Sequence, residues 1–230
     1  VKRNWSISMC GIFGQISKTR INKEKFKKLV KHAEQRGVDS SGIAYYDTDV
    51  YKILRADYNI EKLLNNVNPY KSKVAFGHSR LITNGFNDNQ PVVRDKMCVI
   101  HNGIIVNEQK IWDNIGLDRL YKIDSECIVA IAQYCLKGGL SVDEIPEKVL
   151  SMCQGVVACA LLLPEYGKLL LFSNNGSLYI GHCEEDIYFA SERYALDEIA
   201  CEDIEQVKHN YKILDIPFCD KDFIISDNNQ

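Results

Sequence analysis

Apolar residues recur at helical spacing in several parts of the chain. From residue 22 to residue 36 they fall on one face, with Asn22 placed to cap the helix and Gly37 to end it. The strongest helical pattern runs from residue 124 to residue 136, with acidic residues at its start and a Gly-Gly pair behind it. Further helices are predicted over residues 107–115, 141–152 and 192–200.

Short runs rich in β-formers predict strands at both ends of the chain, with helices between them. The runs cover residues 42–46, 50–55, 73–77, 97–101, 156–163, 168–173, 178–181, 187–190 and 211–216. Short turns connect many of these strands, which do not alternate regularly with helices. The pattern therefore favours an α+β fold of mostly antiparallel sheets with helices packed against them, in a layered sandwich. The polar tail, residues 217–230, is expected to fray.

Composition narrows the class of protein. With 230 residues, of which 46% are hydrophobic and 26% charged, the chain can bury a full core, which excludes intrinsic disorder. The net charge of −3 and the absence of long charged runs predict no nucleic-acid or anionic-lipid partner. The longest apolar run, 156–163, is far too short to cross a membrane.

Nine cysteines are present, an odd number in a long chain without a signal-peptide pattern. We therefore expect reduced thiols and a cytoplasmic protein, with most cysteines buried as small apolar residues. No Cys-x-x-Cys pair occurs, and the five histidines have no metal-ligand spacing. Neither a metal nor a cofactor is predicted.

Five segments interrupt the pattern with residues that a fold alone does not require. Each is weak by itself, since His-Asn-Gly is typical of a hairpin turn and Asp-Ser-Glu of a helix cap. The segments are Met9-Cys10-Gly11-Ile12-Phe13-Gly14, Arg36-Gly37-Val38-Asp39-Ser40-Ser41-Gly42, the glycine-flanked run 77–85 with Gly77-His78-Ser79-Arg80, His101-Asn102-Gly103 with the four residues that follow, and Asp124-Ser125-Glu126.

In this order and spacing, the five segments resemble the glutaminase domain of class II glutamine amidotransferases, which are N-terminal-nucleophile hydrolases. The pattern is most similar to the amino-terminal domains of glucosamine-6-phosphate synthase and amidophosphoribosyltransferase. The resemblance covers residues 10–216, which we take as one domain. It implies a four-layer αββα sandwich of two mostly antiparallel sheets, and hydrolysis of L-glutamine to glutamate and ammonia.

The resemblance implies that Cys10 is the nucleophile, forming a thioester with the γ-carboxamide carbon of glutamine. The base in this family is the cysteine's own α-amine, whose ordinary pKa of about 7.7–8.0 suits proton transfer in both directions. The side-chain amide of Asn102 and the backbone N–H of Gly103 would stabilise the oxyanion.

Substrate contacts are assigned by the same resemblance. Arg80 would bind the α-carboxylate of glutamine through its guanidinium, Asp124 the α-ammonium, and Thr83 would assist at the same end. The alternatives are a surface arginine and a helix cap.

The other matched residues are expected to be structural. Arg36, Asp39 and Ser40 would brace the strand of the nucleophile. His78 and His101 are expected to be packed, hydrogen-bonded histidines, and Gln90-Pro91 an architectural turn.

The sequence also departs from the family pattern. Residues 1–9 precede Cys10, although the nucleophile must be the first residue of the mature chain. Three explanations remain open: Met9 is the true initiator, which we favour; a propeptide is removed; or the extension is native and the domain is silent.

The second departure is that no ammonia-acceptor domain is visible. We therefore expect a separate synthase subunit or a missing C-terminal domain as partner, and leave association into a homo-oligomer open. The main alternative function is a catalytically silent, glutamine-binding regulatory subunit with a blocked N-terminus. A cysteine amidohydrolase acting on another amide is a third interpretation, disfavoured because Arg80, Asn102-Gly103 and Asp124 match glutamine.

Overall fold

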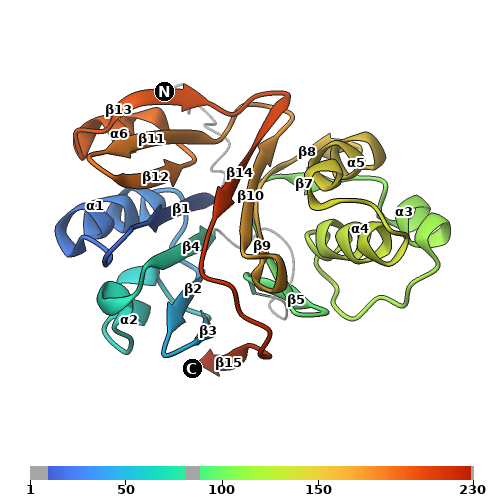
Figure 1. The fold of residues 1–230 in the computed structure, drawn as a ribbon, viewed down its shortest axis with the longest axis horizontal. Coiled ribbons are helices and arrows are strands. Elements are labelled where there is room, and N and C mark those ends of the chain that lie inside the picture. The colour runs from blue at the N-terminus through green and yellow to red at the C-terminus, as the bar shows by residue number, and fades with distance from the viewer. Residues whose placement is uncertain (1–9, 81–88, 229–230) are drawn as a thin grey trace, which may run out of the picture.

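A computed structural model describes residues 10–80 and 89–228 of the chain. Two large sheets lie face to face between two groups of helices (Figure 1). The eight-stranded sheet has the order β13-β11-β12-β1-β4-β2-β3-β15. Its strands are β1 (Gly11–Ile16), β2 (Ser40–Asp47), β3 (Val50–Ala56), β4 (Val74–Arg80), β11 (Tyr179–Cys183), β12 (Asp186–Ala190), β13 (Glu202–Gln206) and β15 (Ile224–Asn228).

The second sheet has five antiparallel strands in the order β14-β10-β9-β6-β5. They are β5 (Val92–Arg94), β6 (Met97–His101), β9 (Ala158–Leu163), β10 (Lys168–Ser173) and β14 (Asn210–Asp215). A small ribbon pairs β7 (Ile104–Ile105) with β8 (Gly155–Val156). Because both large sheets are mostly antiparallel, the predicted sheet type is confirmed.

Helices cover the outer face of each sheet. Those on the eight-stranded sheet are α1 (Lys23–Glu34), α2 (Ile60–Leu64) and α6 (Arg193–Glu198). Those on the five-stranded sheet are α3 (Glu108–Ile115), α4 (Glu126–Lys137) and α5 (Ile145–Met152). The described residues also form three 3-10 turns: η1 (Pro69–Lys71), η2 (Val142–Glu144) and η3 (Pro164–Tyr166). The four layers therefore follow the predicted αββα order.

Alternation along the strands builds three separate cores. In β1, Phe13 packs against α1 in one outer core, whereas Ile12 faces the other sheet in the central core. In β6, Val99 packs under the α3–α5 helices and Ile100 faces inward. Successive side chains of a strand point to opposite faces, so both sheets are buried on both sides.

Helix boundaries follow the local signals with small shifts. The side chain of Asn22 accepts hydrogen bonds from the backbone of Glu24 and Lys25, as predicted for the cap of α1. The helix predicted from residue 124 begins at Glu126, and the one predicted over residues 141–152 is divided into η2 and α5, with Pro146 in the first turn of α5. No helix in the described part of the chain is long and apolar enough to cross a membrane.

The prediction that the tail frays is wrong for residues 224–228. These residues form β15, which pairs in parallel with β3 at the edge of the large sheet. Arg55 donates two hydrogen bonds to the Asp227 carboxylate, at 2.6 and 2.9 Å. Ile224 remains 50% exposed, so backbone pairing and this ion pair hold the strand. The sequence of the strand has no buried apolar pattern that would predict it.

Candidate active site

The strand order brings the matched segments to one edge of the large sheet. Strand β1 is antiparallel to both β4 and β12, and β4 is antiparallel to β2. The start of β1, the end of β4, the start of β2 and the end of β12 therefore meet at the same edge. Cys10, Arg80, Ser40 and Ser191 all lie at these strand ends.

Alternation also places key residues on the inner face. Ile12 lies in the central core, so Cys10, two positions earlier, lies on the same side of β1. Phe76 of β4 faces inward, and Arg80, four positions later on the same strand, lies on the same side because side chains alternate between the two faces. On the opposite sheet, Ile100 faces inward, and Asn102 is two positions beyond it.

The backbone around Cys10 is held from two directions. Arg36 donates from Nε to the Cys10 carbonyl oxygen at 3.1 Å, and its guanidinium pairs with the Glu192 carboxylate. Burial is the main cause that lowers the pKa of the Arg36 guanidinium from its ordinary value. Ile12 N–H donates to Ser191 Oγ at 2.8 Å, and Ser191 N–H donates back to the Ile12 carbonyl at 2.9 Å.

At Gly11, the end of helix α1 approaches β1 closely. A Cβ at this position would lie 2.7 Å from the Cα of Ala33 and 2.8 Å from its carbonyl oxygen. Both contacts are with backbone that cannot move aside cheaply, so only glycine allows this packing. The residue after the predicted nucleophile is therefore fixed by the fold.

Asn102 connects the two sheets. Its side chain is 1% exposed, and its Nδ2 lies 3.5 Å from Ser191 Oγ, the same hydroxyl that accepts from Ile12. Its own backbone N–H donates to the Ala158 carbonyl at 2.8 Å. The amide predicted to stabilise an oxyanion thus lies beside the strand of the predicted nucleophile.

Gly103 is required by a close backbone approach. A Cβ here would lie 1.9 Å from the carbonyl oxygen of Val156 and 2.7 Å from Nε2 of His101. Because β7 and β8 pair immediately after this residue, the contact cannot be relieved without breaking the small ribbon. The Asn102-Gly103 segment is therefore tightly placed.

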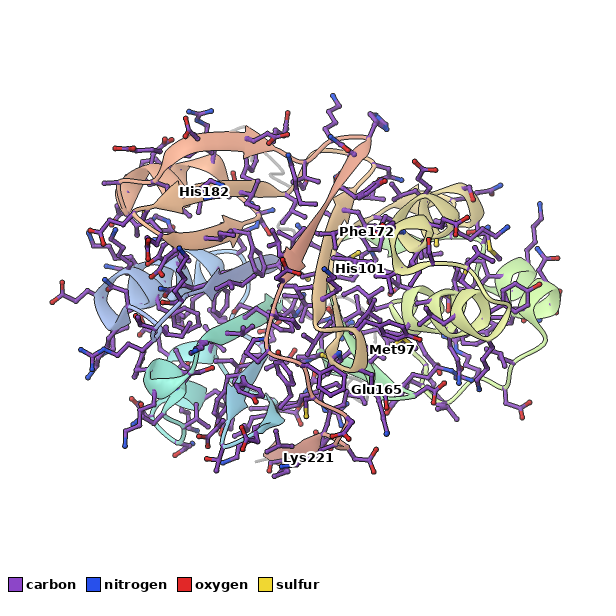
Figure 2. All side chains as sticks on the ribbon, in the orientation of Figure 1. Met97, His101, Glu165, Phe172, His182 and Lys221 are labelled. Carbon is purple, nitrogen blue, oxygen red and sulfur yellow. The ribbon has the colours of Figure 1, made fainter. Side chains whose placement is uncertain are left out.

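His101 supports the Asn102-Gly103 segment and is labelled near the middle of the molecule in Figure 2. Its Nε2 lies 3.1 Å from the Val156 carbonyl and its Nδ1 3.0 Å from Ser125 Oγ. A carbonyl only accepts, so the proton belongs on Nε2 and Nδ1 accepts from the serine hydroxyl. Burial is the main cause that lowers the pKa of His101, which keeps the ring neutral.

Gln90 completes the support of His101. Its Oε1 accepts from the His101 N–H at 2.5 Å, and its Nε2 donates to the His101 carbonyl at 3.0 Å. The prediction of a packed, hydrogen-bonded His101 is confirmed, and the Gln90 contacts with the His101 backbone are compatible with the architectural role predicted for Gln90-Pro91. His78 is also buried, which lowers its pKa to about 3, but its Nε2 has no hydrogen-bond partner among the described residues.

Asp124 is tied to the same region without capping α4. Its Oδ2 accepts from the Ile105 N–H at 2.8 Å, and Ser125, the residue at the cap position, makes no side-chain capping bond. The helix-cap alternative is therefore wrong. The Asp124 carboxylate is half-buried, and the residue that donates to it, Ile105, is two positions after Gly103.

Arg80 is half-buried at the end of β4 and pairs in register with Ser40 of β2. Asp39 N–H donates to the Arg80 carbonyl at 3.0 Å. Asp39 and Ser40, which were predicted to brace the nucleophile's strand, thus contact the backbone of Arg80, the predicted carboxylate-binding arginine. Thr83 lies outside the described residues.

Sequence reasoning missed Ser191 and Glu192. They follow the strand predicted over residues 187–190, where a Ser-Glu pair in front of a helix is typical of a cap. In the structure, the Ser191 hydroxyl instead accepts a hydrogen bond from the Ile12 N–H, and the Glu192 carboxylate pairs with Arg36, which contacts the Cys10 carbonyl. Only the antiparallel pairing of β1 with β12 brings them there, and no local pattern encodes it.

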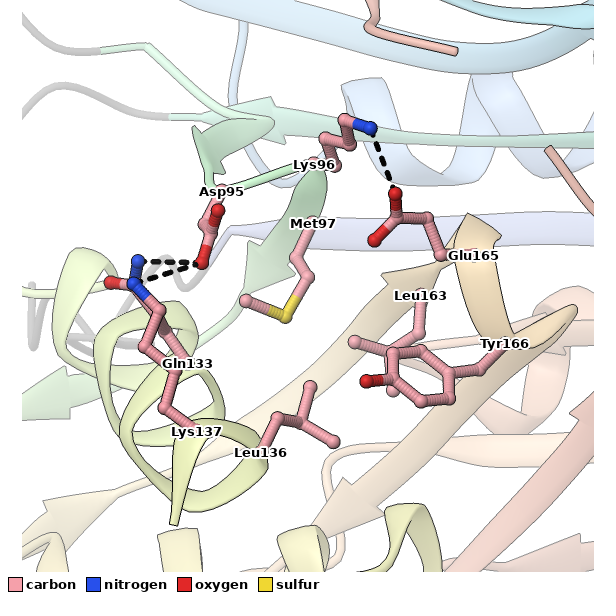
Figure 3. Close-up of a pocket in the computed structure, with 9 residues that line it drawn as sticks. All are labelled: Asp95, Lys96, Met97, Gln133, Leu136, Lys137, Leu163, Glu165 and Tyr166. Carbon is pink, nitrogen blue, oxygen red and sulfur yellow. Dashed lines mark hydrogen bonds and ion pairs between the residues drawn. The ribbon is translucent and has the colours of Figure 1, made fainter. Parts of the chain in front are cut away.

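A surface cavity of about 160 Å³ lies elsewhere, at the start of β6 (Figure 3). It is bordered by the Lys96–Glu165 ion pair, at 2.8 Å, and by the Gln133–Asp95 hydrogen bond, at 2.6 Å. Met97 lines it, whereas His101 ends the same strand beside the candidate site. The cavity contains none of the residues predicted from the sequence to be functional.

Comparison with known proteins agrees with this geometry. The chain is 30% identical to the glutamine–fructose-6-phosphate aminotransferase (isomerizing) of Bartonella henselae over 199 residues, which cover 82% of this chain and 32% of the relative. The enzyme of the same name from Campylobacter jejuni is 30% identical over 194 residues, covering 80% and 32%. The chain thus spans about a third of the length of these relatives.

Solved structures show the same fold. Glutamine phosphoribosylpyrophosphate amidotransferase from B. subtilis, complexed with ADP and GMP, matches 90% of this chain and 49% of its own, with a TM-score of 0.71 and 20% identity. A glutamine aminotransferase class-II domain protein from Silicibacter pomeroyi matches 89% of this chain and 98% of its own, with a TM-score of 0.55 and 13% identity.

A family-level match settles the membership. Residues 78–198, more than half of the chain, match the glutamine amidotransferase domain family. This range includes Arg80, Asn102, Gly103, Asp124 and the Ser191-Glu192 pair. The chain therefore belongs to the class II glutamine amidotransferase domain family.

Proposed function

We propose that this domain hydrolyses L-glutamine to glutamate and ammonia through a thioester on Cys10. The observation that carries the proposal is the position of Ser191 Oγ. It accepts from the Ile12 N–H at 2.8 Å and lies 3.5 Å from the Asn102 amide nitrogen. The strand that follows Cys10 and the proposed oxyanion donor Asn102 belong to different sheets, and both contact this one hydroxyl.

The chemistry divides into two acyl transfers. The Cys10 thiolate attacks the γ-carbonyl carbon of glutamine, and the carbonyl oxygen becomes an oxyanion between Asn102 Nδ2 and Gly103 N–H. The protonated α-amine of Cys10 gives its proton to the departing ammonia, which leaves a γ-glutamyl thioester. Water then attacks the thioester with the α-amine as base, which releases glutamate and the free thiol.

Recognition of the substrate's ends follows from charge. The Arg80 guanidinium can bind the α-carboxylate with two parallel hydrogen bonds, and the Asp124 carboxylate can pair with the α-ammonium. Thr83 would add a hydroxyl near Arg80. Asp124 already accepts one bond from the ribbon, at Ile105, so its position is fixed before the substrate binds.

The mechanism requires that Cys10 carry a free α-amine. An amide nitrogen in its place has no basic lone pair, so a chain that retains residue 9 lacks the base. We infer that the active form starts at Cys10, with Met9 as the initiator that is removed.

Labelling with 6-diazo-5-oxo-norleucine, an electrophilic glutamine analogue, tests this proposal. A chain prepared to start at Cys10 should gain one adduct, mapped to Cys10, and should release ammonia from glutamine. A matched chain that keeps Met9, with no other change, should gain no adduct at the same reagent concentration. Intact mass followed by peptide mapping measures both.

Two outcomes would contradict the proposal. If the chain starting at Cys10 binds glutamine by calorimetry but neither labels nor releases ammonia, the domain is the silent binding subunit. If the Met9-retaining chain labels equally fast, the α-amine is not the base.

Ammonia must then reach an acceptor. The curated relatives are about three times longer than the matched region, so they contain further domains beyond it. We propose that ammonia from this site passes to a synthase domain or partner subunit that activates the acceptor.

Asn102→Ala should lower kcat for glutamine hydrolysis by about 10²–10³-fold, because one of two oxyanion donors is lost. KM should change little, since the oxyanion exists only after attack. Ammonia release by the chain that starts at Cys10 measures both constants. Asn65→Ala, at an exposed asparagine that ends α2, is the control and should leave them unchanged. A variant in which KM rises and kcat holds would assign Asn102 to ground-state binding instead.

A further inference from the structure

Two cysteines face each other at the edge of the large sheet, away from Cys10. Cys183 is the last residue of β11, and Cys201 directly precedes β13. These strands are antiparallel, with His182 opposite Glu202, so Cys183 and Cys201 occupy the next facing position of the pair. Facing residues of antiparallel strands have Cα atoms about 4.5–5.5 Å apart, which is within the span of a disulfide.

The two sulfur atoms are already in contact. Cys183 Sγ and Cys201 Sγ lie 2.9 Å apart, with one S–H donating to the other sulfur. A disulfide bond is about 2.05 Å long, so the sulfurs need to approach by only about 0.9 Å. Cys183 is buried and Cys201 is partly exposed, so a small reagent can reach one member of the pair.

We propose that Cys183 and Cys201 form an intramolecular disulfide by exchange with a low-molecular-weight disulfide such as oxidised glutathione. The Cys201 thiolate attacks the glutathione disulfide, and one glutathione thiolate leaves. The Cys183 thiolate then attacks the Cys201 sulfur of the mixed disulfide and releases the second glutathione. Two protein thiols lose two protons and two electrons, and one glutathione disulfide becomes two thiols.

The surroundings of the pair set the rate of this exchange. Burial raises the pKa of the Cys201 thiol, and its hydrogen bond with Cys183 raises it further. Of the charged groups around it, Lys25 of α1 opposes this rise, whereas Asp197 of α6 adds to it. Only the thiolate attacks, so the exchange should accelerate about tenfold per pH unit between pH 7 and pH 9.

The bond would close a ring that contains functional residues. The segment between the two cysteines includes β12, Ser191, Glu192 and α6. Ser191 contacts Ile12 and Asn102, and Glu192 pairs with Arg36. Cross-linking the ends of this segment restrains it in the unfolded chain, so the oxidised protein should melt about 5–10 °C higher than the reduced protein.

The test is oxidation of the whole chain with increasing ratios of oxidised to reduced glutathione. Free thiols are then alkylated and the protein is digested and mapped by mass. We expect the peptides of Cys183 and Cys201 to be joined, with the loss of two hydrogen atoms, and to be alkylated separately after reduction. Melting temperatures of both forms give the second readout.

Single-cysteine variants complete the design. In Cys183→Ala and Cys201→Ala the oxidation-dependent rise in melting temperature should vanish, whereas Cys135→Ala, at a buried cysteine of α4, should keep it. A wild-type protein that accumulates a stable glutathione adduct on Cys201, with Cys183 still free, would overturn the proposal. So would complete alkylation of both thiols at the highest oxidant ratio. Neither outcome depends on glutamine hydrolysis, so the proposed function is not tested by them.

Discussion

Cys10→Ala in a chain that starts at this residue should reduce glutamine hydrolysis by about 10⁴-fold or more, while glutamine still binds. No other group in the described site can form the thioester, so the reaction loses its covalent route. Arg80 and Asp124 remain in place, because their positions depend on β4 and on the bond from Ile105. Ammonia release measures the first effect and calorimetry the second.

The matched control is Cys135→Ala, which removes a buried thiol far along α4 and should leave hydrolysis intact. A Cys10→Ala protein that retains hydrolysis within tenfold of the parent would remove Cys10 from the mechanism. Loss of glutamine binding together with activity, in a folded protein, would show that the thiol positions the substrate as well.

Glu126→Ala should lower the free energy of unfolding by about 3–5 kcal/mol, because it leaves a buried guanidinium without its counter-charge. The Glu126 side chain is fully buried and accepts from Arg94 Nη1 at 2.7 Å. It also accepts from the backbone of Leu120 at 3.0 Å and of Tyr121 at 2.8 Å. Arg94 is itself 8% exposed, so water cannot replace the carboxylate.

Urea unfolding followed by circular dichroism measures this loss. Asp215→Ala is the control, since its ion pair with Lys168, at 2.6 Å, involves an aspartate side chain that is 91% exposed. Removing such a surface pair should cost less than about 1 kcal/mol. An equal loss in the two variants would show that the Arg94–Glu126 pair adds nothing beyond a surface contact.

Residues with a strong local pattern were predicted well from the sequence. The strand over residues 168–173 matches β10 at both ends, because five of its six residues are buried and Gly167 ends the preceding turn. The first helix matches α1 to within two residues at its end, since Asn22 caps it as expected. Such segments carry their own signals, and burial agrees with them.

Other elements gave no such signal. Strand β13 reads Glu-Asp-Ile-Glu-Gln and has no buried residue, so nothing in its composition indicates an edge strand. Helix α2 has five residues, too few for a helical period to show. Strand β15 depends on the edge that β3 offers, which is a property of the assembled sheet.

The residues of the candidate site also differ in whether the sequence could predict them. Cys10, Arg80, Asn102 and Asp124 were predicted because a family pattern marks them. Ser191 and Glu192 were not, since their function arises from a pairing between strands near opposite ends of the chain. The hydrogen bond from Ile105 to Asp124 likewise depends on how the small ribbon meets the start of α4.

The central position of β1 has a consequence for synthesis of the domain. Phe13 pairs with Ala190, so β1, which begins beside Cys10, is synthesised before the other described strands of the domain, yet one of its neighbours is synthesised only after most of the domain has been translated. Contacts over such long separations are formed late and slowly. Until β12 docks, Ser191 and Glu192 cannot hold Ile12 and Arg36. A nascent chain therefore exposes Cys10 before β12 can pair with its strand, and the site proposed around Cys10 is assembled only when translation of the domain is nearly complete.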